Sequence, residues 1–130
     1  KKIDIYNNGK MYRDFTYIDD IVNAIYLLIN KAPSLRQLGK IRNDSLSTVA
    51  PFRILNIGNT DKIFLQSFIN ELEKQIGIKA IKNYMPMQKG DVKMTLSDTT
   101  LLKKITGYNS KTNYKIGIKK FLKWYLKYYN

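Results

Sequence analysis

Arg13 is the residue whose type and setting point most directly to chemistry. It is one of only four arginines beside 19 lysines, and it stands between an Asn-Asn-Gly turn and a segment rich in aromatic and β-branched residues. A planar guanidinium can hold an anion such as phosphate through two parallel N–H bonds. An ion pair with Asp14, Asp20 or Asp91 explains the same residue equally well. The spacing alone leaves anion binding and ion pairing open.

Several common kinds of active site are excluded by what the chain lacks. Its 130 residues include no Cys and no His, which removes thiol nucleophiles, Ser-His-Asp triads, structural zinc and disulfides. Two glycine-rich motifs commonly bind phosphates, G-x-x-x-x-G-K-[ST] and a G-x-G-x-x-G that follows a strand. Neither occurs in this sequence. Tyr6 and Lys10 have the spacing of a Tyr-x-x-x-Lys pair, but Asn7-Asn8-Gly9 between them disfavours the helix that such a pair needs. We therefore predict no catalytic residue, no cofactor-binding residue and no metal site in this chain.

The excess of positive charge can mean a solvated lysine surface or a surface that binds an anionic partner. The sequence has 23 Lys and Arg against 10 Asp and Glu, a formal net charge of +13. Residues 99–130 carry eight Lys and no acid, and aromatic side chains there, such as Trp124 and Tyr128, could stack on bases. These aromatics recur, however, at the spacing of a core-facing helix stripe. We predict a solvated lysine face, and a nucleic acid is not the favoured partner.

The length and the apolar content favour one compact core. Hydrophobic residues make up 44% of the chain, and no apolar run reaches the roughly 18 to 20 residues that span a bilayer. The Lys-Lys start is not followed by the apolar core of a signal peptide. We expect a single domain over residues 1–130, without a membrane partner, in a reducing compartment, the cytoplasm.

The first half of the sequence reads as a strand, a turn, a helix and a loop. Residues 3–6 alternate in polarity and stop at the turn Asn7–Gly9. Residues 13–18 are predicted to be extended. A helix over residues 19–31 follows, capped by Asp19 or Asp20, and residues 34–51 form a long loop.

The second half predicts a βαβ-like unit followed by two helices. Residues 53–57 give a buried-strand signal, a helix follows from about residue 64 to Ile76 with Gly77 as its C-terminal cap, and residues 79–84 form another strand. Further along, the pattern predicts a polar turn at 87–92, an extended stretch at 94–96, a short helix capped by Ser97 or Asp98 that runs to Ile105, and a last helix at 114–128 whose apolar face holds Ile118, Phe121, Leu122 and Tyr125.

Four blocks of the sequence resemble a known family. They lie at residues 3–21, which include Arg13-Asp14-Phe15, at 50–59, at 87–92 with Asp98-Thr99, and at 117–125. In this order they are similar to the extended short-chain dehydrogenase/reductase nucleotide-sugar epimerases, and within them to UDP-glucuronate 4-epimerases. The resemblance covers essentially the whole chain but only the C-terminal third or so of such an enzyme.

The resemblance implies an α/β fold, namely the C-terminal substrate-binding portion of a Rossmann-type enzyme with short strands and about four helices. The N-terminal half, absent here, would bind NAD and carry the catalytic Tyr and Lys. In that family NAD takes a hydride from C4 of the sugar, the 4-keto sugar rotates, and the hydride returns to the opposite face. This chain alone is expected to be inactive, its partners would be a UDP-sugar and the Rossmann half, and the intact enzyme is expected to be a homodimer.

The same resemblance assigns five substrate-binding residues. Arg13 matches the arginine that contacts the UDP phosphates, Asp4 and Tyr6 match positions that flank the uracil, and Asp91 matches an aspartate near the ribose or diphosphate. Gln88 stands where UDP-galactose epimerases carry a second phosphate-binding arginine, as the glucuronate-type enzymes tend to have. The expected activity converts UDP-glucuronate to UDP-galacturonate in capsular polysaccharide synthesis. Alternatives are another UDP-hexose 4-epimerase, a dehydratase of the same family, or a basic module that binds UDP or nucleic acid.

Overall fold

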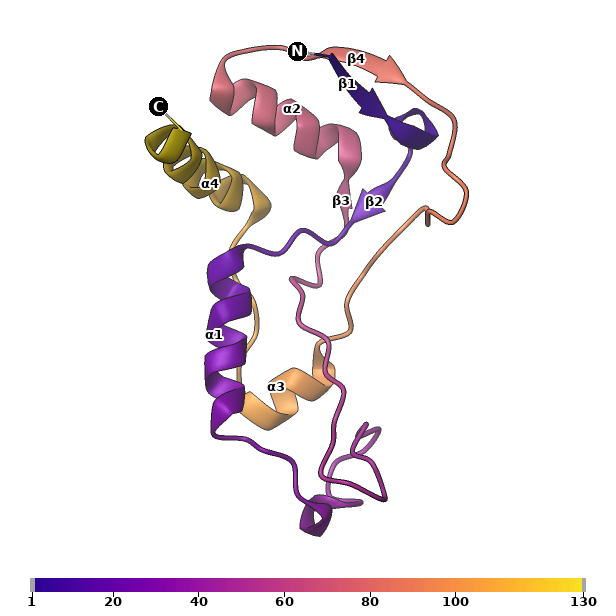
Figure 1. Ribbon diagram of the computed structural model, residues 1–130, viewed down its shortest axis with the longest axis vertical. Helices are drawn as coiled ribbons and strands as arrows, with labels where there is room; N and C mark the ends of the chain where they lie inside the picture. The colour runs from indigo at the N-terminus through magenta and orange to yellow at the C-terminus, as the bar shows by residue number, and fades with distance from the viewer. Residues whose placement is uncertain (1, 130) are drawn as a thin grey trace. The chain divides into compact units, whose positions relative to one another are not determined.

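The computed structural model describes residues 2–129 and divides them into two compact units (Figure 1). The first unit contains the chain up to Phe15, then Asp61–Leu96, and the chain from Thr112 onward. The second unit contains Thr16–Thr60 and Ser97–Lys111. Residues 2–129 form four α-helices and four short strands, which confirms the predicted α/β class and helix content.

Two small pairs of strands organise the first unit. Strand β1 (Lys2–Ile5) lies parallel to β4 (Ile81–Tyr84), and β2 (Tyr12–Arg13) lies antiparallel to β3 (Ile63–Phe64). The strands predicted near residues 3–6 and 79–84 are thus confirmed. Because β1 and β4 are distant in sequence, their pairing brings the N-terminal segment beside the segment that follows Tyr84.

A tight turn ends β1 and redirects the chain toward β2. The 3₁₀ turn η1 (Tyr6–Gly9) has Asn7 and Asn8 at φ 51° and Gly9 at φ 75°. Asn and Gly tolerate this left-handed region better than other residues. The predicted turn is confirmed, and Tyr6 and Lys10 accordingly do not share one face of an α-helix.

Two helices cover the first unit. Helix α2 (Leu65–Ile76) ends at Gly77, whose φ of 77° makes the left-handed C-terminal cap that the sequence predicts. It packs against α4 (Tyr114–Tyr129), where Ile118 and Leu122 are buried. The ring of Phe68 in α2 also stacks on Phe15, with ring centroids 3.8 Å apart.

The second unit is built around two helices and a long connection. Helix α1 (Ile18–Ile29) packs on α3 (Thr100–Thr106), and Ala24 and Leu102 are fully buried there. The predicted loop at 34–51 holds one short 3₁₀ turn, η2 (Leu35–Gln37), and no α-helix or strand.

Buried polar contacts tie the second unit together. The Tyr108 hydroxyl donates to Asp20 Oδ1 at 2.9 Å, and burial together with this carboxylate raises the pKa of Tyr108. The Arg53 guanidinium donates to both oxygens of Asp44, at 2.8 and 2.9 Å. These hydrogen bonds lower the pKa of Asp44.

The predicted strand at 53–57 is wrong. The described residues contain no strand partner for it, and β4, its expected companion in a βαβ unit, pairs with β1 instead. A strand needs a neighbour to complete its ladder, and local sequence reports only the propensity of the segment itself.

Helix capping by Asp19 or Asp20 is also wrong. Tyr17, not an aspartate, is the N-cap residue of α1, and its side chain makes no capping hydrogen bond. Both aspartates lie in the first helical turn, where a negative charge still favours the helix dipole.

The aromatic residues of α4 do not form a core stripe. Phe121, Trp124 and Tyr125 are 46%, 53% and 43% exposed, and they contact one another instead. No helix among residues 2–129 has the length and apolar character that crossing a bilayer requires. Nor do the described residues hold a cluster of acidic side chains arranged for a metal ion.

Candidate functional site

All five predicted binding residues lie on two neighbouring segments of the first unit. The strand pairing sets Asp4 opposite Asn83, and the backbone contacts continue beyond the strands. Asn8 N donates to Met85 O and Tyr12 N donates to Lys93 O, both at 2.9 Å. The stretch from Asp4 to Arg13 therefore runs beside the stretch from Asn83 to Thr95, and the structure brings the predicted residues to one region.

Arg13 and Asp91 are in direct contact. Arg13 Nη2 lies 2.7 Å from Asp91 Oδ1, and the two side chains are 21% and 27% exposed. Nη1 donates to the Tyr12 carbonyl at 2.9 Å, whereas Nε has no hydrogen bond within residues 2–129. Among the ion pairs that the sequence allows for Arg13, the structure thus contains the one with Asp91. The pair is partly exposed, so an anion can still reach the guanidinium.

A tight turn places Asp91 against Arg13. Asp91 N donates to Gln88 O at 3.3 Å, and Gly90 has φ 84°, as the third residue of a type II turn requires. Asp91 Oδ1 also accepts from Val92 N at 2.8 Å, which holds its carboxylate toward the arginine. Gln88 begins this turn and is exposed. The predicted polar turn at 87–92 is thus the element that positions the acid of the pair.

Asp4 and Tyr6 lie at the end of β1. Asp4 Oδ1 accepts a hydrogen bond from Asn83 Nδ2 at 2.7 Å, and Tyr6 follows β1 directly and is half-buried. Sequence reasoning missed Asn83, although its amide is the group that meets the predicted acid. The signal needed to find it is the register between β1 and β4, which the local pattern does not contain.

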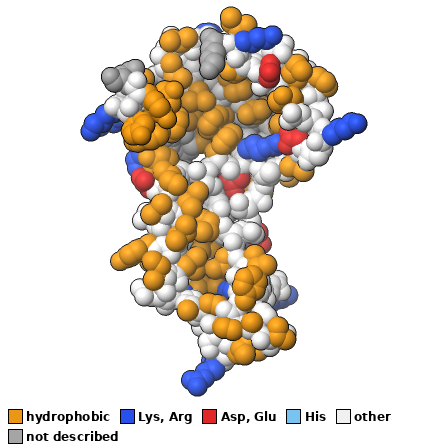
Figure 2. Space-filling model, viewed as in Figure 1, with side chains coloured by type: hydrophobic (Ala, Val, Ile, Leu, Met, Phe, Trp, Pro, Cys, Tyr) orange, Lys and Arg blue, Asp and Glu red, His pale blue; other side chains and the backbone are white. Residues whose placement is uncertain are grey.

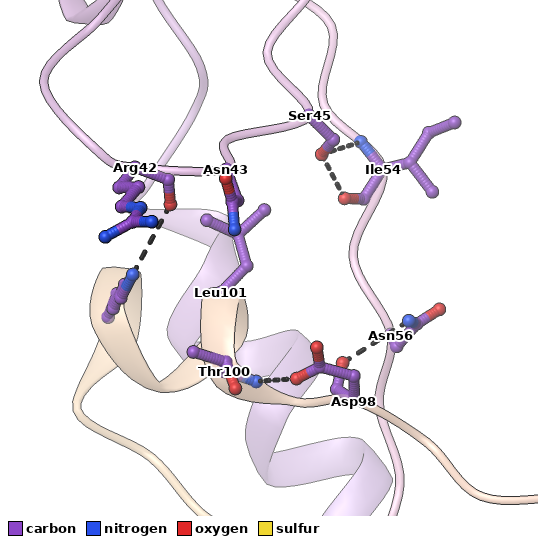
Figure 3. Close-up of a pocket in the computed structure, with 9 residues that line it drawn as sticks. Arg42, Asn43, Ser45, Ile54, Asn56, Asp98, Thr100 and Leu101 are labelled. Carbon is purple, nitrogen blue, oxygen red and sulfur yellow. Dashed lines mark hydrogen bonds between the residues drawn. The ribbon is translucent and has the colours of Figure 1, made fainter.

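A separate cavity of about 390 Å³ lies within the second unit (Figure 3). Asp98 accepts from Thr100 N at 2.9 Å, and the hydrogen bonds from Thr100 lower the pKa of Asp98. Lys104 Nζ donates to the Arg42 carbonyl, and Asn56 Nδ2 donates to Asp98 O. None of the five predicted binding residues lines this cavity. Its polar groups bond mainly to one another and include no paired acid and base.

Comparisons with known proteins find one family model and several relatives that are similar to this chain. The NAD dependent epimerase/dehydratase family matches residues 1–42. A probable UDP-glucuronate 4-epimerase of Rhizobium meliloti is 41% identical over 127 residues, which are 96% of this chain and 37% of that protein. Protein CapI of Staphylococcus aureus is 41% identical over 128 residues, 98% of this chain and 38% of that protein.

Over nearly its whole length the chain is similar to part of these proteins. It spans about two fifths of the length of these relatives. The UDP-glucuronic acid 4-epimerase of Bacillus cereus, solved with UDP-glucuronic acid and NAD, shares its fold with a TM-score of 0.75. That comparison covers 99% of this chain and 36% of the Bacillus chain at 23% identity. The family resemblance and fold class expected from the sequence are confirmed.

Proposed function

We propose that this epimerase chain supplies the UDP-sugar-binding part of an NAD-dependent UDP-glucuronate 4-epimerase. The contact between Arg13 and Asp91 carries the proposal, because it presents a partly exposed guanidinium on the two segments that also hold Asp4, Tyr6 and Gln88. The names of the Rhizobium and Bacillus proteins support the substrate, UDP-glucuronate, and its conversion to UDP-galacturonate. Cytoplasmic location, a homodimeric enzyme and a role in polysaccharide synthesis stay predictions.

The residues of this chain do not fit an NAD site. No glycine-rich turn follows a strand, so no backbone cradle for the dinucleotide phosphates exists among the described elements. We assign NAD, which supplies hydride transfer in such enzymes, to the part of the protein outside this chain. The role left to this chain is to bind and orient the nucleotide end of the substrate.

The side chains divide that role between them. Arg13 would contact the diphosphate through its partly exposed guanidinium while Asp91 keeps the guanidinium in position. Asp4, held by Asn83, and Tyr6 would face the uracil, and Gln88 would approach the phosphates from the turn. A UDP-uronate carries roughly three negative charges, which the surplus of lysine would attract. Binding energy at the nucleotide end would hold the substrate while its sugar ring turns.

The test uses the N-terminal part of the Rhizobium relative fused to this chain, so that both parts of an epimerase are present. Titration calorimetry with UDP-glucuronate should show saturable binding, and Arg13→Ala should reduce the affinity at least tenfold. Arg36→Ala removes an exposed arginine of the second unit and should leave the affinity unchanged. Equal affinity of the Arg13→Ala protein and the parent would refute the proposal.

The same fused protein separates the alternatives. Formation of UDP-galacturonate from UDP-glucuronate, followed by NMR, is the expected result. Conversion of UDP-glucose with no conversion of UDP-glucuronate would instead identify a hexose epimerase, and loss of water from the sugar would identify a dehydratase.

A further inference from the structure

Helix α4 carries a cluster of exposed aromatic side chains. This aromatic patch consists of Phe121, Trp124, Tyr125, Tyr128 and Tyr129, which are 43% to 69% exposed. The first four recur at positions i, i+3, i+4 and i+7, so they share one side of the helix. Their rings contact one another, and the closest centroids, those of Tyr125 and Tyr129, are 4.7 Å apart. Large apolar side chains that gather at a surface mark a site of interaction.

A row of lysines runs beside the aromatic patch. Helix α4 has five lysines and no acidic residue, and four of the lysines form this lysine row, namely Lys119, Lys120, Lys123 and Lys127, all exposed. Glu71 of α2 lines a hollow together with Lys119 and Lys123 and can offset one of these charges. Figure 2 shows hydrophobic and basic side chains next to each other over the position that α4 occupies in Figure 1. The helix therefore presents an aromatic side and a positively charged side.

These two features together suit the surface of a membrane that contains anionic lipids. Trp and Tyr favour the boundary between lipid and water, because each combines an apolar ring with a polar tip. Lysines near such a surface are attracted to the negative headgroups. A helix with an aromatic side and a basic side can therefore lie in this boundary, parallel to the membrane.

A nucleic acid or a second copy of this chain suits the helix less well. Bases stack on free ring faces, but the rings of Trp124 and Tyr128 already face each other, with centroids 5.6 Å apart and planes 22° from parallel. The basic residues of α4 are all lysines, which lack the planar fork by which arginine reads base edges. Two copies paired symmetrically through α4 would bring two lysine rows together, and like charges repel.

We propose that α4 binds the surface of membranes that contain anionic lipids. The aromatic patch enters the headgroup region, and the lysine row contacts the negative headgroups. A helix that lies on the surface needs no apolar run long enough to cross the bilayer. The expectation of no membrane partner rests on the lack of such a run and of a signal peptide, so it does not bear on surface binding. The proposal is independent of the proposed function, because α4 contains none of the five predicted binding residues.

The experiment uses the N-terminal part of the Rhizobium relative fused to this chain, so that any surface the other part covers is covered. Vesicles of equal parts phosphatidylglycerol and phosphatidylcholine are added, and bound protein is measured by flotation. Trp124→Ser/Tyr128→Ser and Lys123→Gln/Lys127→Gln should each weaken binding at least tenfold, because the first removes aromatic rings and the second removes positive charge. Vesicles of phosphatidylcholine alone should bind the parent at least tenfold more weakly.

Two control variants make matched changes elsewhere. Ile78→Ser/Ile81→Ser changes two apolar residues of the first unit that are each 67% exposed. Lys31→Gln/Lys40→Gln removes two exposed lysines of the second unit. Both controls should bind the anionic vesicles like the parent. Circular dichroism checks that every variant is folded.

The fluorescence of Trp124 tests the aromatic patch directly, because it is the only Trp of this chain. The difference between the emission of the parent and of Trp124→Phe isolates the signal of this residue in the fused protein. That signal should shift to shorter wavelength when anionic vesicles are added, since the ring leaves water for the headgroup region. Vesicles of phosphatidylcholine alone should not shift it.

Several results would overturn the proposal. These are no binding to anionic vesicles, equal binding by the parent and Trp124→Ser/Tyr128→Ser, or an unshifted Trp124 signal. A dimer that dissociates in Trp124→Ser/Tyr128→Ser, seen by sedimentation velocity, would assign the patch to a second copy instead. Binding of a single-stranded oligonucleotide that needs Trp124 and Tyr128, without vesicle binding, would assign it to a nucleic acid. Turnover of UDP-glucuronate should be equal in the parent and in all α4 variants, and its absence from the parent would contradict the proposed function alone.

Discussion

The carboxylate that contacts Arg13 would also determine how that arginine meets the ligand of the proposed function. Asp91 occupies Nη2, and the Tyr12 carbonyl occupies Nη1. A guanidinium fixed at these two points loses little freedom when an anion arrives, which favours binding. Asp91 also opposes binding, because its negative charge lies beside the approaching phosphate. In the proposed function the pair would therefore favour a ligand that offers further contacts, such as a base and a sugar, over free phosphate.

A second arginine–aspartate pair makes the stability of the fold depend on pH in the acidic range. Arg53 and Asp44 are 4% and 6% exposed, and their hydrogen bonds lower the pKa of Asp44 in the folded state. Such a carboxylate stabilises the fold above its unfolded pKa of about 3.9, and this contribution is lost as the pH falls through the lower folded value. Asp44→Asn removes the negative charge and leaves the buried Arg53 with neutral hydrogen-bond partners such as Gln37 Oε1 and no carboxylate.

We expect Asp44→Asn to lower the urea midpoint clearly at pH 7. Below about pH 4 the difference from the parent should shrink progressively, because the parent carboxylate becomes protonated and both side chains are then neutral. The measurement is urea unfolding at a series of pH values. The exposed Asp61→Asn serves as the control and should follow the parent throughout. A loss of stability in Asp44→Asn that is the same at every pH would show that this ion pair is not its source.

Individual elements divide into those that local sequence predicts and those that need a partner. Helix α2 and its Gly77 cap follow from apolar spacing and one glycine, so their positions agree with the prediction. The strand signal at 53–57 is equally clear, yet no ladder forms because pairing depends on a neighbour. The same limit applies to the site, where Arg13 and Asp91 could be named from the sequence but Asn83 could not. Its role depends on the register between β1 and β4.

The turn at residues 88–91 is the element most directly connected to the site. Gly90 has φ 84° and no other atom near the place of a side chain, so Gly90→Ala introduces backbone strain without a steric clash. We expect a loss of about 1 kcal/mol of stability and, because the turn positions Asp91, weaker UDP-glucuronate binding by the fused protein.

Gly39→Ala is the matched control for this substitution. Gly39 has φ 72°, is equally free of close contacts, and belongs to the second unit, which contains none of the five predicted residues. It should lose similar stability in thermal unfolding but keep its affinity in calorimetry. Equal affinities for the two glycine variants would mean that the turn does not position the site.

At the scale of the whole molecule, the net charge of +13 would attract either a nucleotide-sugar or a nucleic acid, and the salt dependence of binding distinguishes the two. A surface that neutralises six or more phosphates loses about a thousandfold or more in affinity between 50 and 200 mM salt. A site with one arginine on a diphosphate should lose far less. We expect UDP-glucuronate affinity of the fused protein, measured by calorimetry, to fall less than tenfold over this range.

A single-stranded oligonucleotide provides the comparison, with binding followed by fluorescence anisotropy at the same salt concentrations. Its binding should be weak and should disappear as salt is added. Tight oligonucleotide binding that persists at 200 mM salt would favour the nucleic-acid module over the epimerase part.

The interleaving of the two units has a consequence for synthesis on the ribosome. The first unit needs α4, whose Ile118 and Leu122 belong to its core, and α4 is made after the other helices of residues 2–129. The second unit is complete once Lys111 has left the exit tunnel. The order of maturation is therefore set by the chain's connectivity: once Lys111 has left the tunnel, α1 can pack on α3 while the strands of the first unit still lack α4 and stay accessible to chaperones.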